Sequence, residues 1–263
     1  GGIAIPGALE RSGVAPDQVE QVSFGQVIQA GQGQIPSRQA QIAGGIPKEV
    51  PSETVNKVCA SGMRAAGLID QAIRAGDIEV GVAGGMESMS NAPYLLPGAR
   101  FGFRMGDNKT VDSMTHDGLT NPFTHLQMIN EASVVANELG ISREEMDRFA
   151  ARSHELAEKA RLDGTLGEEI VPVTVKGRKG DTVVDADEQP LSARPDKIPQ
   201  LKAAFAKDGT ITAANSSSIS DGGSALVLTT AAEAAKRGLQ PLARVVAHSR
   251  HSHEPNLFTT APV

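Results

Sequence analysis

The chain of 263 residues is 40% hydrophobic and 21% charged, a globular composition that can bury a substantial core as one large α/β domain or two modest ones. Its formal net charge of −6 argues against a nucleic-acid-binding protein, because such a protein needs a broad basic surface. The single cysteine excludes an internal disulfide framework and fits a reducing compartment, and no apolar run approaches the length of a membrane span.

The first part of the chain predicts short elements. Residues 3–11 form an amphipathic segment, and residues 19–28 alternate loosely, as a strand does. The glycine-rich stretch 31–34 lacks the lysine and the long spacing of a phosphate-binding loop, so we expect a turn there. Ser37 is expected to cap a helix that runs to Ile42.

The next stretch, residues 54–76, contains the single cysteine between a predicted strand and a predicted helix. Branched residues over 54–58 predict a strand, and apolar residues at helical spacing from Met63 predict a helix that ends at Gly76. Cys59 therefore lies where a strand becomes a helix, and the free N–H groups and positive dipole end of a helix favour a thiolate and can hold an oxyanion. This is the position of the nucleophile in a nucleophile elbow. The alternative is a buried cysteine that only fills space.

Residues 78–83 form a compact apolar run, which predicts a strand covered on both faces. The order strand, helix, strand predicts a right-handed βαβ unit, whose site residues lie in loops at the carboxyl ends of the strands. Residues 84–88 are expected in such a loop. Glu87 within it is either a buried acid or a structural anchor for the loop.

From residue 89 to about residue 189, prolines and glycines mark a long excursion from this alternation. Two helices are predicted within it, at about 125–139 and at 143–162, and Ser142 and Glu145 form a capping box for the second.

Shorter elements are predicted after these helices, beginning with a β-hairpin that has a basic tip. The expected elements are hairpin strands at 170–175 and 182–184, a helical piece at 201–205, strands at 210–214, 225–229 and 242–248, and a helix at 231–237.

The segment VNKVCASGMRA at 55–65 resembles the nucleophilic-cysteine segment of the thiolases, the acyl-CoA C-acyltransferases. Five further blocks match this family in its order along the chain. They are AGQGQIPSRQA at 30–40, AGGMESMSNAPYLL at 83–96, RMGD at 104–107, DSMTHDGL at 112–119 and NSSSISDGGSA at 215–225.

The resemblance implies a thiolase fold, in which one layered α/β/α half carries an inserted loop domain, and it implies that the chain is incomplete. It places the N-terminal α/β domain at 1–88 and 190–247, the loop domain at 89–189 and the start of the C-terminal half at 248–263. The likeness begins inside the family's first helix and stops about two-thirds of the way through the family's length. We therefore expect the remaining C-terminal motifs to lie beyond residue 263.

For Cys59, the resemblance implies attack on an acyl-CoA carbonyl, an acyl-thioester on the enzyme and release of CoA. The carbanion of a second acyl-CoA would then attack the acyl-enzyme. The resemblance thus implies an acetyl-CoA C-acyltransferase that cleaves 3-ketoacyl-CoA or makes acetoacetyl-CoA. None of the six histidines matches the family's activating histidine, and no second cysteine is present, so we expect the chain as given to be inactive.

Further positions match family residues that bind CoA or the acyl chain: Leu119, Met128, Phe205, Ala213 and Ser217. Ser217 matches the serine that bonds to the pantetheine amide, and the alternative for it is a capping role in a serine-rich turn. For the others, the alternative is an ordinary residue of the protein core.

The resemblance also implies CoA thioesters as substrates, no other cofactor and no metal. It implies a homodimer or homotetramer without nucleic-acid or membrane partners, and a cytoplasmic enzyme of fatty acid and lipid metabolism. Histidines at 248, 251 and 253 could suggest a metal site. Their spacing fits no single face of a helix or strand, so we expect surface histidines.

Two alternatives stay open. A β-ketoacyl synthase-type condensing enzyme shares the cysteine elbow but lacks the GGMESM and RMGD blocks. A non-catalytic acyl-CoA-binding or lipid-binding protein would keep a thiolase-like half without acyl transfer. Labelling of Cys59 by acetyl-CoA separates such a binding protein from an enzyme.

Overall fold

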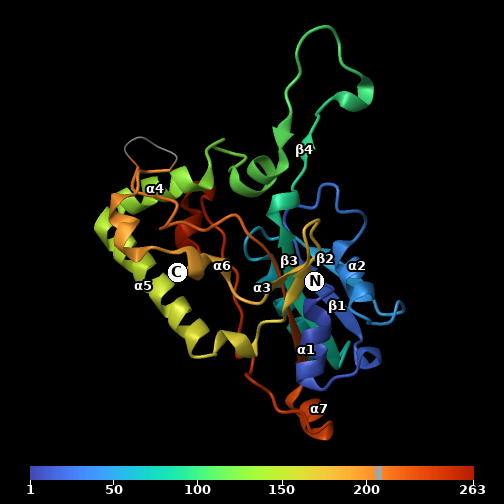
Figure 1. Cartoon of the computed structure of the whole chain (residues 1–263). Coiled ribbons are helices and arrows are strands. Elements are labelled where there is room, and N and C mark those ends of the chain that lie inside the picture. Colours follow the sequence, from blue (N-terminus) through green and yellow to red (C-terminus); the bar gives the residue numbers. More distant parts are fainter. Residues whose placement is uncertain (205–208) are drawn as a thin grey trace. The chain divides into compact units, whose positions relative to one another are not determined.

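A computed structural model describes residues 1–204 and 209–263 (Figure 1). Backbone contacts divide the chain into two compact units. The sheet unit comprises Gly1–Gly118 and Ile219–Arg250, and the helical unit comprises Leu119–Ser218 and His251–Val263. These bounds differ from the predicted domains, whose division stays a prediction. No helix within the described part of the chain is long and apolar enough to cross a membrane.

The sheet unit is built on four strands in the order β2-β1-β3-β8. These are β2 (Ser52–Val55), β1 (Gln21–Gly25), β3 (Val80–Ser88) and β8 (Asp221–Thr229). Strand β1 pairs in parallel with both β2 and β3, and β8 pairs antiparallel with β3. The α/β fold class is therefore confirmed, as a mixed sheet with an antiparallel edge strand.

One face of the sheet packs against α1 (Ala4–Ser12) and α2 (Pro36–Ala43). Side chains alternate across a strand, so every second residue of β1 and β3 contributes to this face. The buried residues of this core include Ile5 and Leu9 from α1, and Val22, Phe24, Val80 and Val82 from the strands. The amphipathic segment predicted at 3–11 thus forms one of the two helices that cover this face.

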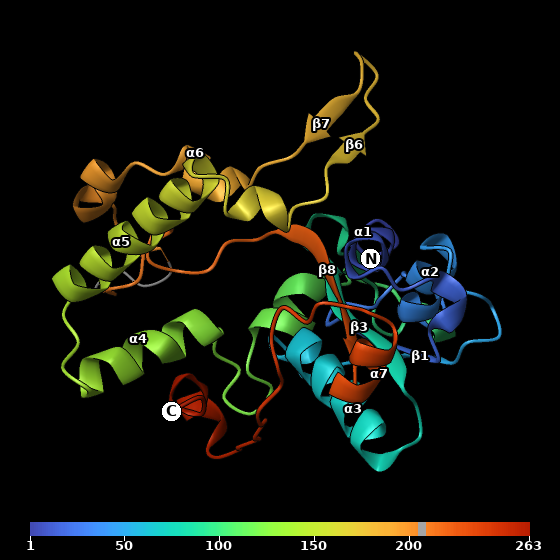
Figure 2. The ribbon, with the colours of Figure 1, turned by 90° about the horizontal axis from the view of Figure 1, so that it is seen from below.

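The other face packs against α3 (Ser61–Ala75), as Figure 2 shows. The strand residues that point to this face are small, such as Gly81 and Ala83, and a Cβ at Gly81 would lie 2.5 Å from Ile69 of α3. Helices on both faces make this unit a layered α/β/α arrangement. Helix α7 (Ala231–Lys236) follows β8, and Thr230 caps it by accepting from the N–H of Glu233 at 3.0 Å.

The expectations for residues 84–88 and for Ser37 were wrong. Residues 84–88 belong to β3 and not to a loop, because β8 pairs with β3 along its whole length, from Val80↔Thr229 to Ser88↔Asp221. Ser37 does not cap α2, since the N-cap is Ile35 with a left-handed φ of 43°. The hydroxyl of Ser37 instead lies 2.8 Å from the hydroxyl of Ser52 and joins α2 to β2.

The remaining elements of the sheet unit are short. They are the helical turns η1 (Pro16–Gln18), η2 (Met89–Asn91), η3 (Ala99–Phe101) and η4 (Met114–Leu119), and the paired strands β4 (Tyr94–Leu95) and β5 (Val111–Asp112).

The helical unit contains α4 (Met128–Glu138) and α5 (Arg143–Leu162). The capping box predicted for α5 is present, because Ser142 Oγ accepts from the N–H of Glu145 and the Glu145 carboxylate accepts from the N–H of Ser142. The predicted hairpin is formed by β6 (Val173–Val175) and β7 (Thr182–Val184). The remaining helical pieces are η5 (Leu166–Glu168), α6 (Glu188–Ser192), η6 (Pro195–Gln200) and η7 (Pro255–Thr260).

Three predicted elements are absent from the described residues at 201–204, 210–214 and 242–248. At 210–214, side chains take the backbone hydrogen bonds that a strand would need. Asn215 accepts from the N–H of Thr212 at 2.7 Å and donates to the carbonyl of Thr210 at 3.1 Å. At 242–248 no strand pairs with the segment, and an α3 side chain, Arg74, donates to the carbonyl of Val245 at 3.1 Å.

Candidate active site

Cys59 lies in the turn that joins β2 to α3, one residue before the helix N-cap Ala60. Its side chain is exposed to solvent. The expectation that the cysteine stands where a strand becomes a helix is therefore confirmed, although β2 ends at Val55, earlier than predicted. The cysteine is therefore not buried in this structure, and its catalytic role stays a prediction.

Ser61 holds this turn together from inside. It is buried, with 4% of its surface exposed. Its hydroxyl accepts from the N–H of Lys57 at 2.8 Å and donates to the carbonyl of Val58 at 2.5 Å. One side chain thus binds two backbone groups of the turn, and the Val58 carbonyl also accepts from the N–H of Ser61 at 3.0 Å.

The residue before the cysteine, Val58, has a left-handed backbone with a φ of 48°. Such a value is a genuine outlier for a β-branched residue, because its side chain crowds the backbone in that region. Asn56 Oδ1 accepts from the N–H of Val58 at 2.9 Å. The turn into α3 is therefore sharp and locally strained, as in a nucleophile elbow.

Glycines let the start of α3 approach the sheet closely. A Cβ on Gly25, at the end of β1, would lie 2.2 Å from the carbonyl carbon of Ser61 and 2.3 Å from the nitrogen of Gly62. A Cβ on Gly85 of β3 would lie 3.2 Å from the Cα of Gly62. The backbone of the first helical turn therefore packs directly on β1 and β3, which fixes the position of the helix end that follows Cys59.

The helix end beside Cys59 has unpaired donors. Among the described residues, the N–H groups of Gly62 and Met63 make no backbone hydrogen bond, because the first turn of a helix has no preceding carbonyls in register. These donors and the helix dipole favour negative charge next to the turn. The arrangement can stabilise an oxyanion that forms on a carbonyl attacked by the sulfur.

Glu87 is an anchor for a neighbouring loop. Its carboxylate accepts from the N–H of Val27 at 2.8 Å and from the N–H of Ile28 at 3.1 Å. Glu87 lies in β3, so these bonds fasten the loop after β1 to the sheet. Of the two predicted roles for Glu87, the contacts support the structural anchor.

Two of the predicted CoA-binding residues, Leu119 and Met128, lie at the two ends of one loop in the helical unit. Leu119 ends η4 and Met128 begins α4, and an isolated antiparallel bridge pairs their neighbours Thr120 and Gln127. The structure thus brings their backbones together.

The loop between these two residues is held by Glu131, which sequence reasoning missed. Glu131 is 3% exposed, and its carboxylate accepts from Asn121 Nδ2 at 2.9 Å and from Thr124 Oγ1 at 2.5 Å. An acid ten residues after an asparagine is not a recognisable pattern, so no local signal in the sequence would have indicated this contact.

Ala213 and Ser217 are both exposed, in the irregular segment that precedes β8. Asn215 between them donates to Asp147 of α5 at 3.0 Å, which ties the segment to that helix. Phe205 lies outside the described residues. The described residues among these predicted CoA-binding positions belong to the helical unit and Cys59 to the sheet unit, and the binding roles stay predictions.

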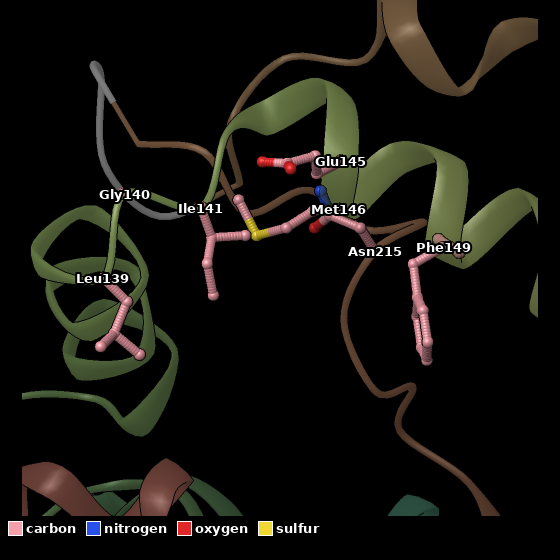
Figure 3. A pocket seen from close by; sticks show the side chains of 8 residues that line it. Leu139, Gly140, Ile141, Glu145, Met146, Phe149 and Asn215 are labelled. Atoms are coloured by element: carbon pink, nitrogen blue, oxygen red, sulfur yellow. The ribbon is translucent and has the colours of Figure 1, made fainter.

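A hollow of about 450 Å³ lies between the end of α4 and the first turns of α5 (Figure 3). Leu139, Ile141, Met146 and Phe149 supply its apolar lining, and Glu145 and Asn215 line it as well. The described site residues predicted from the sequence are not among its lining residues.

The histidines near residue 250 make separate contacts. His248 Nε2 lies 3.3 Å from Asp70 Oδ2 of α3, and the rings of His251 and His253 are 5.2 Å apart. No cluster of three or more metal-ligating side chains occurs in the described ranges 1–204 and 209–263. The expectation of surface histidines stays a prediction.

A layered α/β protein with an exposed cysteine at a strained strand-to-helix turn is of the class that can use the cysteine as a nucleophile. Residues 1–232 match the family described as thiolase, N-terminal domain. The chain belongs to the thiolase family.

Relatives named acetyl-CoA acetyltransferase match the whole chain. That of Cupriavidus necator is 48% identical over 265 residues, that of Shinella zoogloeoides 46% over 264 residues and that of Schizosaccharomyces pombe 44% over 264 residues. Each alignment covers 100% of this chain and 67% of the relative. The fold and family expected from the six sequence blocks are thereby confirmed.

Proposed function

We propose that this protein is an acyl-CoA C-acyltransferase that carries the acyl group as a thioester on Cys59. The observation that carries the proposal is the exposed sulfur at the N-terminal end of α3, next to unpaired backbone donors. Membership of the thiolase family and the names of the relatives support it. An exposed cysteine without this setting would not indicate acyl transfer.

The proposed first step exchanges one thioester for another. The Cys59 thiolate attacks the carbonyl carbon of acyl-CoA, a new C–S bond forms, the bond to the CoA sulfur breaks, and CoA leaves and takes up a proton. Exchange between thioesters is close to neutral in energy, so catalysis must come from activation of the nucleophile and stabilisation of the oxyanion.

In the second step, a second acyl-CoA loses an α-proton and its carbanion attacks the acyl-enzyme carbonyl. A C–C bond forms, the bond to Cys59 breaks and the thiolate is restored. The reverse sequence cleaves a 3-ketoacyl-CoA. The proton acceptors for these steps are implied by the family resemblance alone, as a histidine and a second cysteine. Inactivity of the 263 residues by themselves stays a prediction.

Substrate binding in this proposal uses the positions that match the family. Ser217 bonds to the pantetheine amide, and Leu119, Met128, Phe205 and Ala213 line the path of pantetheine and the acyl chain. The exposure of Ser217 and the loop that joins Leu119 to Met128 are compatible with these roles.

The remaining parts of the proposal rest on the resemblance. They are CoA thioesters as substrates without a further cofactor or metal, assembly as a homodimer or homotetramer, and a cytoplasmic role in fatty acid and lipid metabolism.

The test is acyl trapping in the intact protein. We expect incubation with labelled acetyl-CoA, followed by digestion and mass spectrometry, to give one acetyl group on the peptide that contains Cys59. A protein that only binds acyl-CoA would carry none. Absence of the label from Cys59, or its presence elsewhere, would contradict the proposed function.

A further inference from the structure

We propose that Asn56 is a positioning residue for Cys59, because its side chain holds the left-handed Val58 backbone that presents the cysteine for acyl transfer. The inference rests on the proposed function and extends it to a residue three positions before the nucleophile. It begins from the turn between β2 and α3, where a β-branched residue has a positive φ.

The strain at Val58 requires an explanation. Its φ of 48° lies in the left-handed region, which β-branched residues rarely occupy. Without outside support, a valine would relax to a negative φ and rotate the peptide that leads to Cys59. Strained backbone persists when the surrounding contacts hold it, and such positions cluster at functional sites.

Asn56 supplies such a contact. Its Oδ1 accepts from the N–H of Val58 at 2.9 Å, and its Nδ2 donates to the carbonyl of Val27 at 3.3 Å. Val27 is itself anchored, because its N–H donates to Glu87 of β3 at 2.8 Å. Asn56 therefore connects the residue before Cys59 to a loop that is fastened to the sheet. An amide can do this because it donates and accepts at once.

The peptide groups on both sides of Val58 are fixed by different side chains. Asn56 binds the Val58 N–H, and Ser61 binds the Val58 carbonyl at 2.5 Å. The start of α3 sits on β1 and β3, so the turn has a fixed point at each end. A small displacement of a reacting atom is costly in rate, which is why the contact matters for catalysis more than for folding.

The test uses the intact protein and follows transfer from acetyl-CoA to Cys59 in a single turnover. For Asn56→Ala we expect the maximal acetylation rate to fall about five- to tenfold, the effect of one lost hydrogen bond. The acetyl-CoA concentration at half-maximal rate should stay unchanged, since Asn56 is not assigned to CoA binding. Alkylation of the exposed Cys59 by iodoacetamide should stay within about twofold, because a small reagent needs no fixed geometry.

Rescue variants separate positioning from a general structural role. Asn56→Asp keeps the acceptor for the Val58 N–H and should lose less rate than Asn56→Ala. Adding Val58→Gly to Asn56→Ala should restore the rate to within about twofold of the original protein, because glycine adopts positive φ at no steric cost. In the matched control, Val58→Ala is added to Asn56→Ala. Alanine keeps a Cβ, so the acetylation rate should stay low.

An unchanged acetylation rate in Asn56→Ala overturns the inference, and so does a rate that glycine at 58 fails to restore. Parallel losses of acetylation and alkylation would also overturn it, because they would indicate general damage to the turn. A protein with native Asn56 that takes no acetyl group contradicts the proposed function itself, and this inference with it. If the original protein and Asn56→Ala are acetylated equally fast, the role of Asn56 is overturned and the proposed function stands.

Discussion

The position of Cys59 is set by residues close to it in the sequence. Free cysteines are usually buried, whereas this one is exposed at a helix end. The Ser61 hydroxyl binds the N–H of Lys57 and the carbonyl of Val58. The left-handed backbone of Val58 turns the chain toward the start of α3. These contacts involve residues within three positions of Cys59, so the local sequence determines most of the conformation of this turn.

Asp221 is one residue whose ionisation the structure links to stability. Its carboxylate accepts hydrogen bonds from the hydroxyl and, at 3.0 Å, from the N–H of Ser90, which join the start of β8 to η2. These bonds, the Ser90 hydroxyl foremost, hold the pKa of Asp221 below its ordinary value of 3.8. A lowered pKa stabilises the fold above the ordinary value, and this contribution is lost as the pH falls through the folded pKa.

We therefore predict that Asp221→Asn lowers the midpoint of thermal unfolding at neutral pH. The difference from the original protein should shrink as the pH falls below 3.8, the ordinary value for the carboxyl. Thermal unfolding measured across this range checks the prediction, with Asp77→Asn, at an exposed aspartate after α3, as the control. A difference that is constant with pH would show that the ionised carboxylate does not act as described.

At the scale of elements, the close packing of α3 on the sheet depends on glycines, because they have no Cβ. We predict that Gly25→Ala destabilises the protein by about 1–3 kcal/mol or more, because the new Cβ meets helix backbone that cannot move aside alone. It should also slow acetylation of Cys59, since the helix end is displaced. Urea unfolding and acetyl trapping measure the two effects.

Gly222→Ala in β8 is the matched control, because a Cβ there would meet nothing within 4 Å. It should leave acetylation unchanged. If Gly25→Ala behaved like this control in both measurements, the close packing of α3 on β1 would not be needed for the site.

Helix α5 depends on its capping box. We predict that Ser142→Ala destabilises the protein by about 1 kcal/mol, because the N–H of Glu145 loses its acceptor. The loss of the Ser142 hydroxyl also removes a donor to the Glu145 carboxylate. Ser153→Ala, at an exposed site within the same helix, should be neutral or slightly stabilising, since alanine favours the helix interior. Equal unfolding midpoints for both variants would contradict a capping role.

Elements with strong local signals could be predicted from the sequence. The α5 helix begins and ends at the predicted residues, since its cap and its period are both local. Residues 84–88 could not be assigned as strand, because their pairing partner β8 is more than a hundred residues away. Residues 242–248 have the composition of a strand but no neighbour to pair with, and the segment 210–214 is held by the Asn215 side chain instead.

At the scale of the whole molecule, the motif order along the chain was the most informative signal. Six blocks matched the thiolases, and the family is confirmed over residues 1–232. The position of Cys59 at a helix end followed from residue pattern. The contacts of Asn56, Glu87 and Glu131 did not, because each joins segments whose proximity arises only on folding.

The most direct test of the account is turnover by the intact protein with Cys59→Ala. We predict that cleavage of acetoacetyl-CoA by CoA falls at least about a thousandfold, because the covalent intermediate can no longer form. The unfolding midpoint should change little, since the side chain is exposed. Turnover at the original rate in a protein that lacks this sulfur would contradict acyl transfer through Cys59.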